Sequence, residues 1–204
     1  MCGRYLIEDE AYADILQILN DLNAAKDRID MDQNMFKHGE IFPTNIAPVI
    51  GSDNVTFIKW GFPHWKNSSV IINARAETAL EKNMFKKPLR EHRCAVPSSG
   101  FYEWSRAGSG SGKSKLKEKY LFRLPGEHML YMAGIANSFR DAFGDPYTAF
   151  TILTTAANDS IASVHDRMPV ILAADEVNHW IKDDDFMEYA LHRIGPELEQ
   201  EMAV

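Results

Sequence analysis

The sequence lacks the features of extracellular and membrane-spanning proteins. Only Cys2 and Cys94 are cysteines among 204 residues, too few for a disulfide framework. No apolar run approaches the roughly 20 residues that cross a bilayer. Acidic residues at positions 8–10 stand where a secretory signal would need a basic start and an apolar run. These absences predict a reducing, cytoplasmic setting without membrane contact.

Basic side chains are also in deficit, with 22 Lys and Arg against 29 Asp and Glu and a net charge of −7. This balance excludes a general attraction to nucleic acid, so any nucleic-acid site has to be a local cluster of cations. What is present is the composition of an ordinary globular protein, 45% hydrophobic and 25% charged. The length predicts one domain over residues 1–204, and we expect a monomer.

Short apolar stretches separated by turn residues dominate the chain and predict many strands. The strands are expected at Cys2–Ile7, Ala47–Ile50, Val55–Trp60, Ser69–Asn73, Arg93–Trp104 with a break or bend, Tyr120–Leu124, Met129–Ala136, Tyr147–Thr155 and Met168–Leu172. Helical spacing and capping residues predict helices at Glu8–Leu22, Ala74–Phe85, Asn158–Val164, Asp175–Trp180 and Phe186–Arg193. The run 107–119, rich in Gly, Ser and Lys, is typical of a flexible hairpin tip. Together these elements predict an α+β domain with a curled, barrel-like, mainly antiparallel sheet and flanking helices.

The first residues, Met1-Cys2-Gly3-Arg4, carry the most distinctive chemistry. Removal of Met1 would give Cys2 an α-amine and a thiol on adjacent carbons, with ordinary pKa values of about 7.7–8.0 and 8.5. An aldehyde can form a Schiff base with such an amine, and the thiol can then close a five-membered thiazolidine ring. The alternative is that Cys2 is an inert, buried small hydrophobic residue.

Three polar residues elsewhere in the chain are candidates to assist that chemistry. Asn73 ends an apolar strand, where its amide can orient a nucleophile or merely cap the next helix. Glu103 is flanked by aromatic residues, which would raise its pKa if it is buried, although strand alternation could equally place it in solvent. His165 follows a short predicted helix and can exchange protons near pH 7, or serve the structure alone.

Arginines flank these candidates. Arg4, Arg75 and Arg167 each lie within two residues of Cys2, Asn73 or His165, which suggests a site lined for phosphate groups. The alternative interpretation is a set of independent ion pairs with the 29 acids.

Five motifs, in this order along the chain, resemble the SRAP family of SOS-response-associated peptidase proteins, also called abasic-site processing proteins. They are Cys2-Gly3-Arg4-Tyr5, Trp60-Gly61, Asn73-Ala74-Arg75-Ala76-Glu77-Thr78, Gly100-Phe101-Tyr102-Glu103-Trp104 and His165-Asp166-Arg167-Met168-Pro169. The resemblance implies a protein of the DNA damage response that recognises abasic sites in single-stranded DNA. It implies a covalent cross-link through the amine and thiol of Cys2, a lyase-type activity, with Asn73, Glu103 and His165 as catalytic partners.

The resemblance also implies how the DNA strand is held. Arg4, Arg75 and Arg167 would contact its phosphates, while Trp65 and Pro43 would form an apolar wedge beside the lesion. The protein would associate with the nucleoid when it acts on DNA.

Two other functions stay open at this level. In a cysteine or N-terminal-nucleophile hydrolase, Cys2 would attack a peptide carbonyl, His165 would act as base, Asn73 or Glu103 would orient it, and Met1 would be removed by the protein itself. A DNA-binding module without chemistry would need the arginines but not the cysteine. No cofactor or metal ion is expected, because the cysteines and histidines lack any pair at zinc-ligand spacing.

Overall fold

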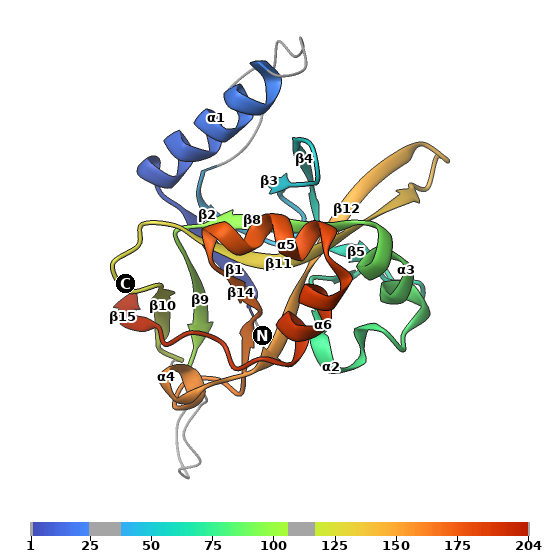
Figure 1. Cartoon of the computed structure of the whole chain (residues 1–204). Helices are drawn as coiled ribbons and strands as arrows, with labels where there is room; N and C mark the ends of the chain where they lie inside the picture. The colour runs from blue at the N-terminus through green and yellow to red at the C-terminus, as the bar shows by residue number, and fades with distance from the viewer. Residues whose placement is uncertain (1, 25–37, 106–116, 204) are drawn as a thin grey trace.

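A closed barrel of five strands forms the centre of the molecule. The structure, a computed structural model, describes residues 2–24, 38–105 and 117–203 (Figure 1). The strands follow one another around the barrel in the order β12, β4, β3, β8 and β11. Their bounds are β3 (Ile46–Ile50), β4 (Val55–Trp60), β8 (Arg93–Ser98), β11 (Leu130–Arg140) and β12 (Pro146–Ala156). Every pairing in the ring is antiparallel except that of β12 with β4, which confirms the predicted α+β class with a barrel-like, mainly antiparallel sheet.

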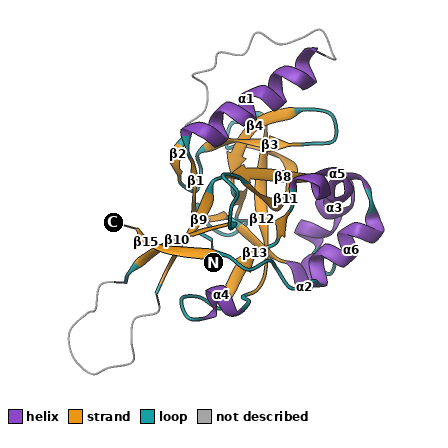
Figure 2. Cartoon of the chain, turned by 60° about the vertical axis from the view of Figure 1, so that its left-hand side comes forward, coloured by secondary structure: helices purple, strands orange, loops and turns teal. Residues whose placement is uncertain are grey.

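A second sheet of five strands lies beside the barrel (Figure 2). Its order is β15 (Glu199–Ala203), β10 (Lys119–Arg123), β9 (Gly100–Trp104), β1 (Arg4–Ile7) and β2 (Gly39–Ile41). Alternation gives this sheet two faces. Tyr5, Phe101 and Phe122 are fully buried in the core cluster that fills the barrel, whereas Arg4 and Tyr102, which pair across β1 and β9, belong to the opposite face. The sheet therefore has a core face and an outer face.

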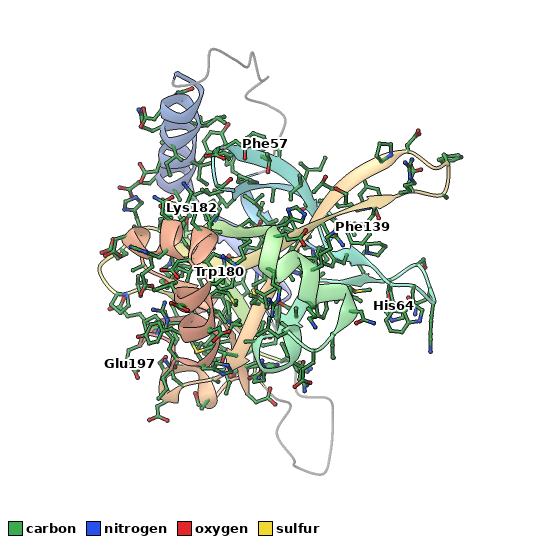
Figure 3. The ribbon with its side chains drawn as sticks, turned by 45° about the vertical axis from the view of Figure 1, so that its right-hand side comes forward. Phe57, His64, Phe139, Trp180, Lys182 and Glu197 are labelled. Atoms are coloured by element: carbon green, nitrogen blue, oxygen red, sulfur yellow. The ribbon has the colours of Figure 1, made fainter. Side chains whose placement is uncertain are left out.

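Helices cover the outside of the barrel. They are α1 (Asp9–Ala24), α2 (Ala76–Ala79), α3 (Asn83–Glu91), α4 (Asp159–Ala162), α5 (Val177–Lys182), which follows a 3₁₀ turn at Ala174–Glu176, and α6 (Asp184–His192). A second apolar cluster joins α2, α3, α5 and α6 to the barrel, with fully buried Trp180 at its centre (Figure 3). Among the described residues, no helix is both long and apolar enough to cross a membrane.

The main departure from the expected elements lies around Asn73. A helix was expected over Ala74–Phe85, but the structure has the short strand β7 (Asn73–Arg75), then α2 and α3. The strand forms because β7 pairs in parallel with β12, with Asn73 opposite Ile152, and local helical spacing carries no information about such a distant partner. The remaining short strands are β5 (Phe62–Pro63), β6 (Val70–Ile71), β13 (Arg167–Pro169) and β14 (Ile171–Leu172).

Two further differences concern the ends of the second sheet. The expected hairpin tip at 107–119 falls mostly outside the described residues. The acidic C-terminal segment, for which no strand was expected, forms β15 at the edge of the sheet, paired antiparallel with β10. Acidic side chains on an edge strand discourage pairing with another chain, so this composition suits the position.

Gly100 marks the point where the chain leaves the barrel and enters the second sheet. A Cβ atom there would lie 2.6 Å from the carbonyl oxygen of Phe122 on the neighbouring strand, closer than real atoms approach. Only glycine therefore permits β9 to start here, which places Glu103 three residues later on the same strand.

Arg93 joins the barrel to three helices, and its removal is expected to destabilise the fold. The buried guanidinium donates to the carbonyls of Trp180 (2.6 Å) and Leu89 (2.9 Å) and to Asp184 (2.8 Å). Each carbonyl that loses its donor costs about 1–3 kcal/mol, so Arg93→Met should lower the free energy of unfolding by about 3 kcal/mol in urea titrations. Asp184→Asn, which alters only the exposed partner, should cost less than about 1 kcal/mol. Equal urea midpoints for wild type and Arg93→Met would contradict this role.

Candidate active site

Cys2 lies just before β1 and is fully buried in the core cluster that fills the barrel. Its thiol donates to the carbonyl oxygen of Arg4 at 3.6 Å. Burial raises the pKa of this thiol far above its ordinary value, and the nearby charge of Glu103 raises it further. The sulfur is therefore a protonated thiol at neutral pH rather than a thiolate. Met1, whose removal the sequence predicts, lies outside the described residues.

Asn73 holds the backbone of Cys2. Its Nδ2 donates to the Cys2 carbonyl oxygen at 2.9 Å. The backbone beside it is fixed, because the Ile72 carbonyl accepts from the indole of Trp60 (3.1 Å) and from the amide of Ile152 (3.1 Å). Oδ1 of Asn73 is buried and has no hydrogen-bond partner within the described part of the chain. The Asn73 amide therefore binds Cys2 through Nδ2, and its Oδ1 can accept a further hydrogen bond beside Cys2.

Glu103 shares the core face of the second sheet with Phe101, so its side chain is buried rather than in solvent. Only 2% of the residue is exposed. Burial raises the pKa of its carboxyl group above the ordinary value, as the aromatic setting predicted. Its Oε2 lies 4.0 Å from Nε2 of His165. A buried carboxyl with a raised pKa keeps its proton to a higher pH than an ordinary glutamate and can donate it to a reacting group.

His165 follows α4 and has a partner in either protonation state. Its Nδ1 accepts from the Arg167 amide at 3.0 Å, and the same nitrogen lies 3.1 Å from Oδ1 of Asp166. A neutral ring can accept from the amide, whereas a protonated ring can donate to the Asp166 carboxylate. With Nε2 directed at Glu103, the ring can carry a proton between the buried carboxyl group and the surface.

The structure brings all four catalytic candidates together. Cys2 contacts Asn73 directly and Glu103 electrostatically, and His165 lies beside Glu103. They come from four distant segments: the residues before β1, strands β7 and β9, and the loop after α4.

Two of the three candidate phosphate-binding arginines are engaged by acids. Arg4 donates to Glu40 at 3.0 Å, and Arg167 forms a two-pronged pair with Glu77 at 2.6 and 2.9 Å. Arg167 also donates to the carbonyl of Thr154. The alternative interpretation, ion pairs with the acids, therefore describes both of these residues as they stand. Arg75 at the end of β7 is exposed.

The two candidate wedge residues occupy separate turns. Trp65 is 72% exposed after β5, and its ring stacks on His64 with centroids 4.9 Å apart. Pro43 is half-buried in the turn between β2 and β3. Trp65 is thus largely exposed although its ring contacts His64 and Lys66, while Pro43 presents a smaller surface.

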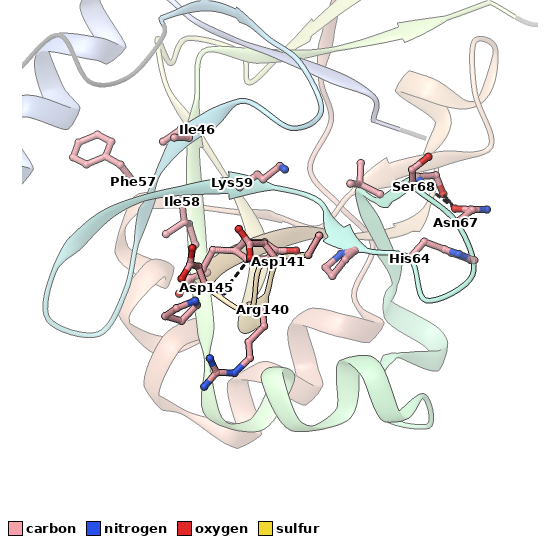
Figure 4. A pocket seen from close by; sticks show the side chains of 17 residues that line it. Ile46, Phe57, Ile58, Lys59, His64, Asn67, Ser68, Arg140, Asp141 and Asp145 are labelled. Carbon is pink, nitrogen blue, oxygen red and sulfur yellow. Dashed lines mark hydrogen bonds between the residues drawn. The ribbon is translucent and has the colours of Figure 1, made fainter.

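A surface cleft of about 1030 Å³ lies between β4 of the barrel and the β5–β6 hairpin that carries His64 (Figure 4). Its walls are β4, the β5–β6 hairpin and the end of the β11–β12 hairpin, and they include Lys59, His64 and Arg140. None of Cys2, Asn73, Glu103 and His165 is among its described lining residues. The catalytic candidates thus form a separate group, with Cys2 and Glu103 buried and Asn73 and His165 partly buried.

Two charged residues near Arg4 were not anticipated from the sequence. Glu40 on β2 bonds both Arg4 and Lys119, and Lys119 on β10 lies with its ammonium 3.9 Å from the centre of the Tyr102 ring. Strand alternation could have shown that Lys119, opposite Trp104, shares a face with Arg4, opposite Tyr102. Lys119 was instead assigned to the hairpin tip. Within the described residues, no cluster of three or more His, Cys, Asp and Glu side chains could hold a metal ion.

Comparison with known proteins identifies relatives over nearly the whole chain. The family model described as SOS response associated peptidase (SRAP) matches residues 1–204. The chain is similar to abasic site processing protein YoaM of Bacillus subtilis, with 36% identity over 89% of this chain and 79% of that protein. It is also similar to abasic site processing protein YoqW of the same organism, with 33% identity over 94% and 86% of the two chains. A crystal structure of a Bacteroides thetaiotaomicron protein shares the fold, with a TM-score of 0.75 and 23% identity over 98% of this chain and 91% of that one.

Proposed function

This chain belongs to the SOS response associated peptidase (SRAP) family, and from that membership we propose that it processes abasic sites in single-stranded DNA. It acts as one domain and as a monomer. After loss of Met1, the α-amine and thiol of Cys2 capture the open-chain sugar as a thiazolidine, a covalent DNA–protein cross-link. Relatives named abasic site processing proteins support the substrate class.

The observation that carries the proposed chemistry is the contact of Asn73 with Cys2. Because Nδ2 of Asn73 bonds the Cys2 carbonyl, the residue that bears the nucleophiles is held in one place. The available Oδ1 of Asn73 accepts from the α-amine of Cys2 and directs its lone pair at the incoming aldehyde. A fixed nucleophile reacts faster because its orientation is already set.

Glu103 and His165 move the protons. An abasic sugar is mostly a closed ring. Glu103 in its protonated form donates to the ring oxygen as the bond between that oxygen and C1 breaks, and the C1 hydroxyl gives its proton back to the carboxylate as the aldehyde forms. The α-amine adds to the aldehyde carbon, and His165 passes the protons that let water leave as the C=N bond forms. The thiol of Cys2 then adds across that bond: sulfur bonds to carbon, and the thiol proton ends on nitrogen.

The surrounding residues hold the strand. Arg75 is exposed and contacts phosphate, and Arg4 and Arg167 do so when phosphate replaces their acidic partners. Stacking of a base on Trp65, 72% exposed, contributes about 1–3 kcal/mol. Selectivity for the lesion follows because an abasic nucleotide has no base to unstack when it enters a buried site.

The buried state of Cys2 speaks against the hydrolase alternative. Attack on a peptide carbonyl requires a thiolate, and reactive cysteines of that kind have lowered pKa values. Burial instead raises the pKa of the Cys2 thiol, and the carboxyl of Glu103 adds to this effect. Addition of a thiol to an imine, with its proton passing to nitrogen, suits a protonated sulfur better.

One incubation tests the proposal. The protein is mixed with abasic and with intact single-stranded DNA, then denatured by heat, and products are resolved on a gel and by intact mass. We expect a heat-stable adduct with abasic DNA alone, on a chain that has lost Met1. Salt-labile binding without an adduct, or cleavage of added peptides without an adduct, would contradict the proposed function.

A further inference from the structure

Glu40 sits between two cations on the outer face of the second sheet. Its Oε1 accepts from Arg4 at 3.0 Å, and the ammonium of Lys119 lies 3.0 Å from the same carboxylate. The three side chains come from β2, β1 and β10, and all are partly exposed. Burial alone would raise the pKa of Glu40, but the hydrogen bonds from Lys119 and Arg4 outweigh it and lower that pKa. Glu40 is therefore ionised at neutral pH and held by both cations.

Aromatic rings keep both cations in place. The guanidinium of Arg4 lies 4.3 Å from the ring centre of Phe42 and 5.3 Å from that of Trp104. Lys119 reaches over Tyr102, 3.9 Å from its ring centre. Such contacts orient the cations independently of the carboxylate between them. If Glu40 moved away, its two partners would remain aimed at the same point.

The Glu40 carboxylate resembles the phosphodiester group of DNA in its charge. A carboxylate carries one negative charge shared by two oxygens, and a phosphodiester carries one negative charge on its two non-bridging oxygens. The Cys2 thiol contacts the backbone carbonyl of Arg4, so the Arg4 side chain starts beside the residue that would bind the abasic sugar. Under the proposed function, the phosphates next to that sugar are the anions nearest to this point. Two cations around one anion leave a net charge of +1, which becomes +2 when the carboxylate is withdrawn.

We propose that Glu40 is an internal substitute for phosphate, and that Lys119 is a further DNA-contacting residue, which joins Arg4 on the backbone phosphate that displaces Glu40. This inference rests on the proposed function for the direction of the strand. Its consequence is selectivity: the carboxylate lowers affinity for undamaged strands, which lack covalent capture to compensate for its displacement. A strand that carries the lesion is retained by the bond to Cys2.

The test measures binding of an undamaged, fluorescein-labelled oligothymidylate by anisotropy over a range of salt concentrations. Glu40→Gln should bind about threefold to fivefold more tightly than wild type, the range that an exposed ion pair spans. Lys119→Gln should bind more weakly by a similar factor, with the slope of log affinity against log salt reduced by about 0.7 for one phosphate contact. Unchanged affinity in Glu40→Gln, or an unchanged salt slope in Lys119→Gln, would overturn the proposal.

Glu8→Gln is the matched control. Glu8 is bound by Arg123 at 2.7 and 2.8 Å near the opposite end of β10, so this variant loses the same charge from another ion pair. It should bind as wild type does; a gain equal to that of Glu40→Gln would show an effect of net charge and contradict the local role. Adduct formation by wild type with abasic DNA reads out the proposed function separately. If wild type forms a normal adduct but the affinities of Glu40→Gln and Lys119→Gln equal that of wild type, only the inference about Glu40 is contradicted. If those affinities change as expected but no adduct forms, only the cross-linking function is contradicted.

Discussion

Cys2→Ala is expected to abolish the heat-stable adduct with abasic DNA while a borohydride-reducible imine persists. Alanine is small enough for Met1 removal and retains the α-amine, so the Schiff base still forms. Without sulfur the ring cannot close, and the imine hydrolyses on heating. The measurement compares denaturing gels of samples heated directly with samples reduced first by borohydride. Durable adduct should fall to background, and reduced adduct should remain.

Cys94→Ala is the natural control for that result. Cys94 is the second buried cysteine, with a thiol pKa that burial raises to about 12, and it lies on β8 opposite Gly134 of the neighbouring strand β11. Its loss should leave both adducts unchanged. A chain that keeps Met1 has its α-amine one residue away from the thiol and should form neither. A durable adduct from Cys2→Ala, or a normal one from a chain with Met1 in place, would overturn the assignment of both nucleophiles.

The four catalytic candidates were predictable from the sequence as chemical types, and as one group through the resemblance of their motifs, but the strand pairings that bring them together were not. Glu103 illustrates the difference. Its aromatic neighbours fit a buried carboxyl or a solvent-facing one equally well, because alternation fixes the period of a strand but not which face meets the core. The pairing of β1 with β9 decides the matter by placing Tyr5 opposite Phe101 on the core face, which also carries Glu103. That register depends on contacts almost a hundred residues apart.

Long-range pairing also explains the parts of the fold that were missed. The backbone at Asn73 follows a strand because β12 offers it a parallel partner, and no local pattern records that partner. The acidic C-terminal strand forms because β10 has a free edge to pair with. Lys119 was assigned to a flexible tip on composition, yet its ammonium is fixed by Glu40 from a segment 79 residues away. Composition identifies solvated segments well and ion pairs between distant segments poorly.

Glu103→Gln is expected to slow adduct formation by about 10²-fold or more, the range of general acid–base catalysis. The amide has nearly the same size but no acidic proton, so the ring oxygen loses its donor and His165 loses the group 4.0 Å from its Nε2. The rate is measured with abasic single-stranded DNA in excess by quenching at intervals and resolving the adduct. Glu127→Gln, a change of an exposed glutamate in the turn before β11, should react at the wild-type rate.

The pH dependence separates this role from a structural one. Burial raises the pKa of Glu103, so its donating form persists to higher pH than in an ordinary glutamate and is lost as pH rises through that value. The α-amine works in the opposite direction, since it must lose its proton, with an ordinary pKa of about 7.7–8.0. Wild type should therefore show a bell-shaped dependence of rate on pH, and Glu103→Gln should keep only the rising limb of the amine.

The raised pKa of Glu103 also affects the pH dependence of folding stability. A raised pKa means that the contribution of Glu103 to stability is full below its unfolded-state pKa and is lost as pH rises through the folded-state value. Glu103→Gln is thus expected to be at least as stable as wild type in urea at neutral pH although it is much slower. A wild-type rate and an unaltered bell in this variant would remove Glu103 from the chemistry, whatever its burial.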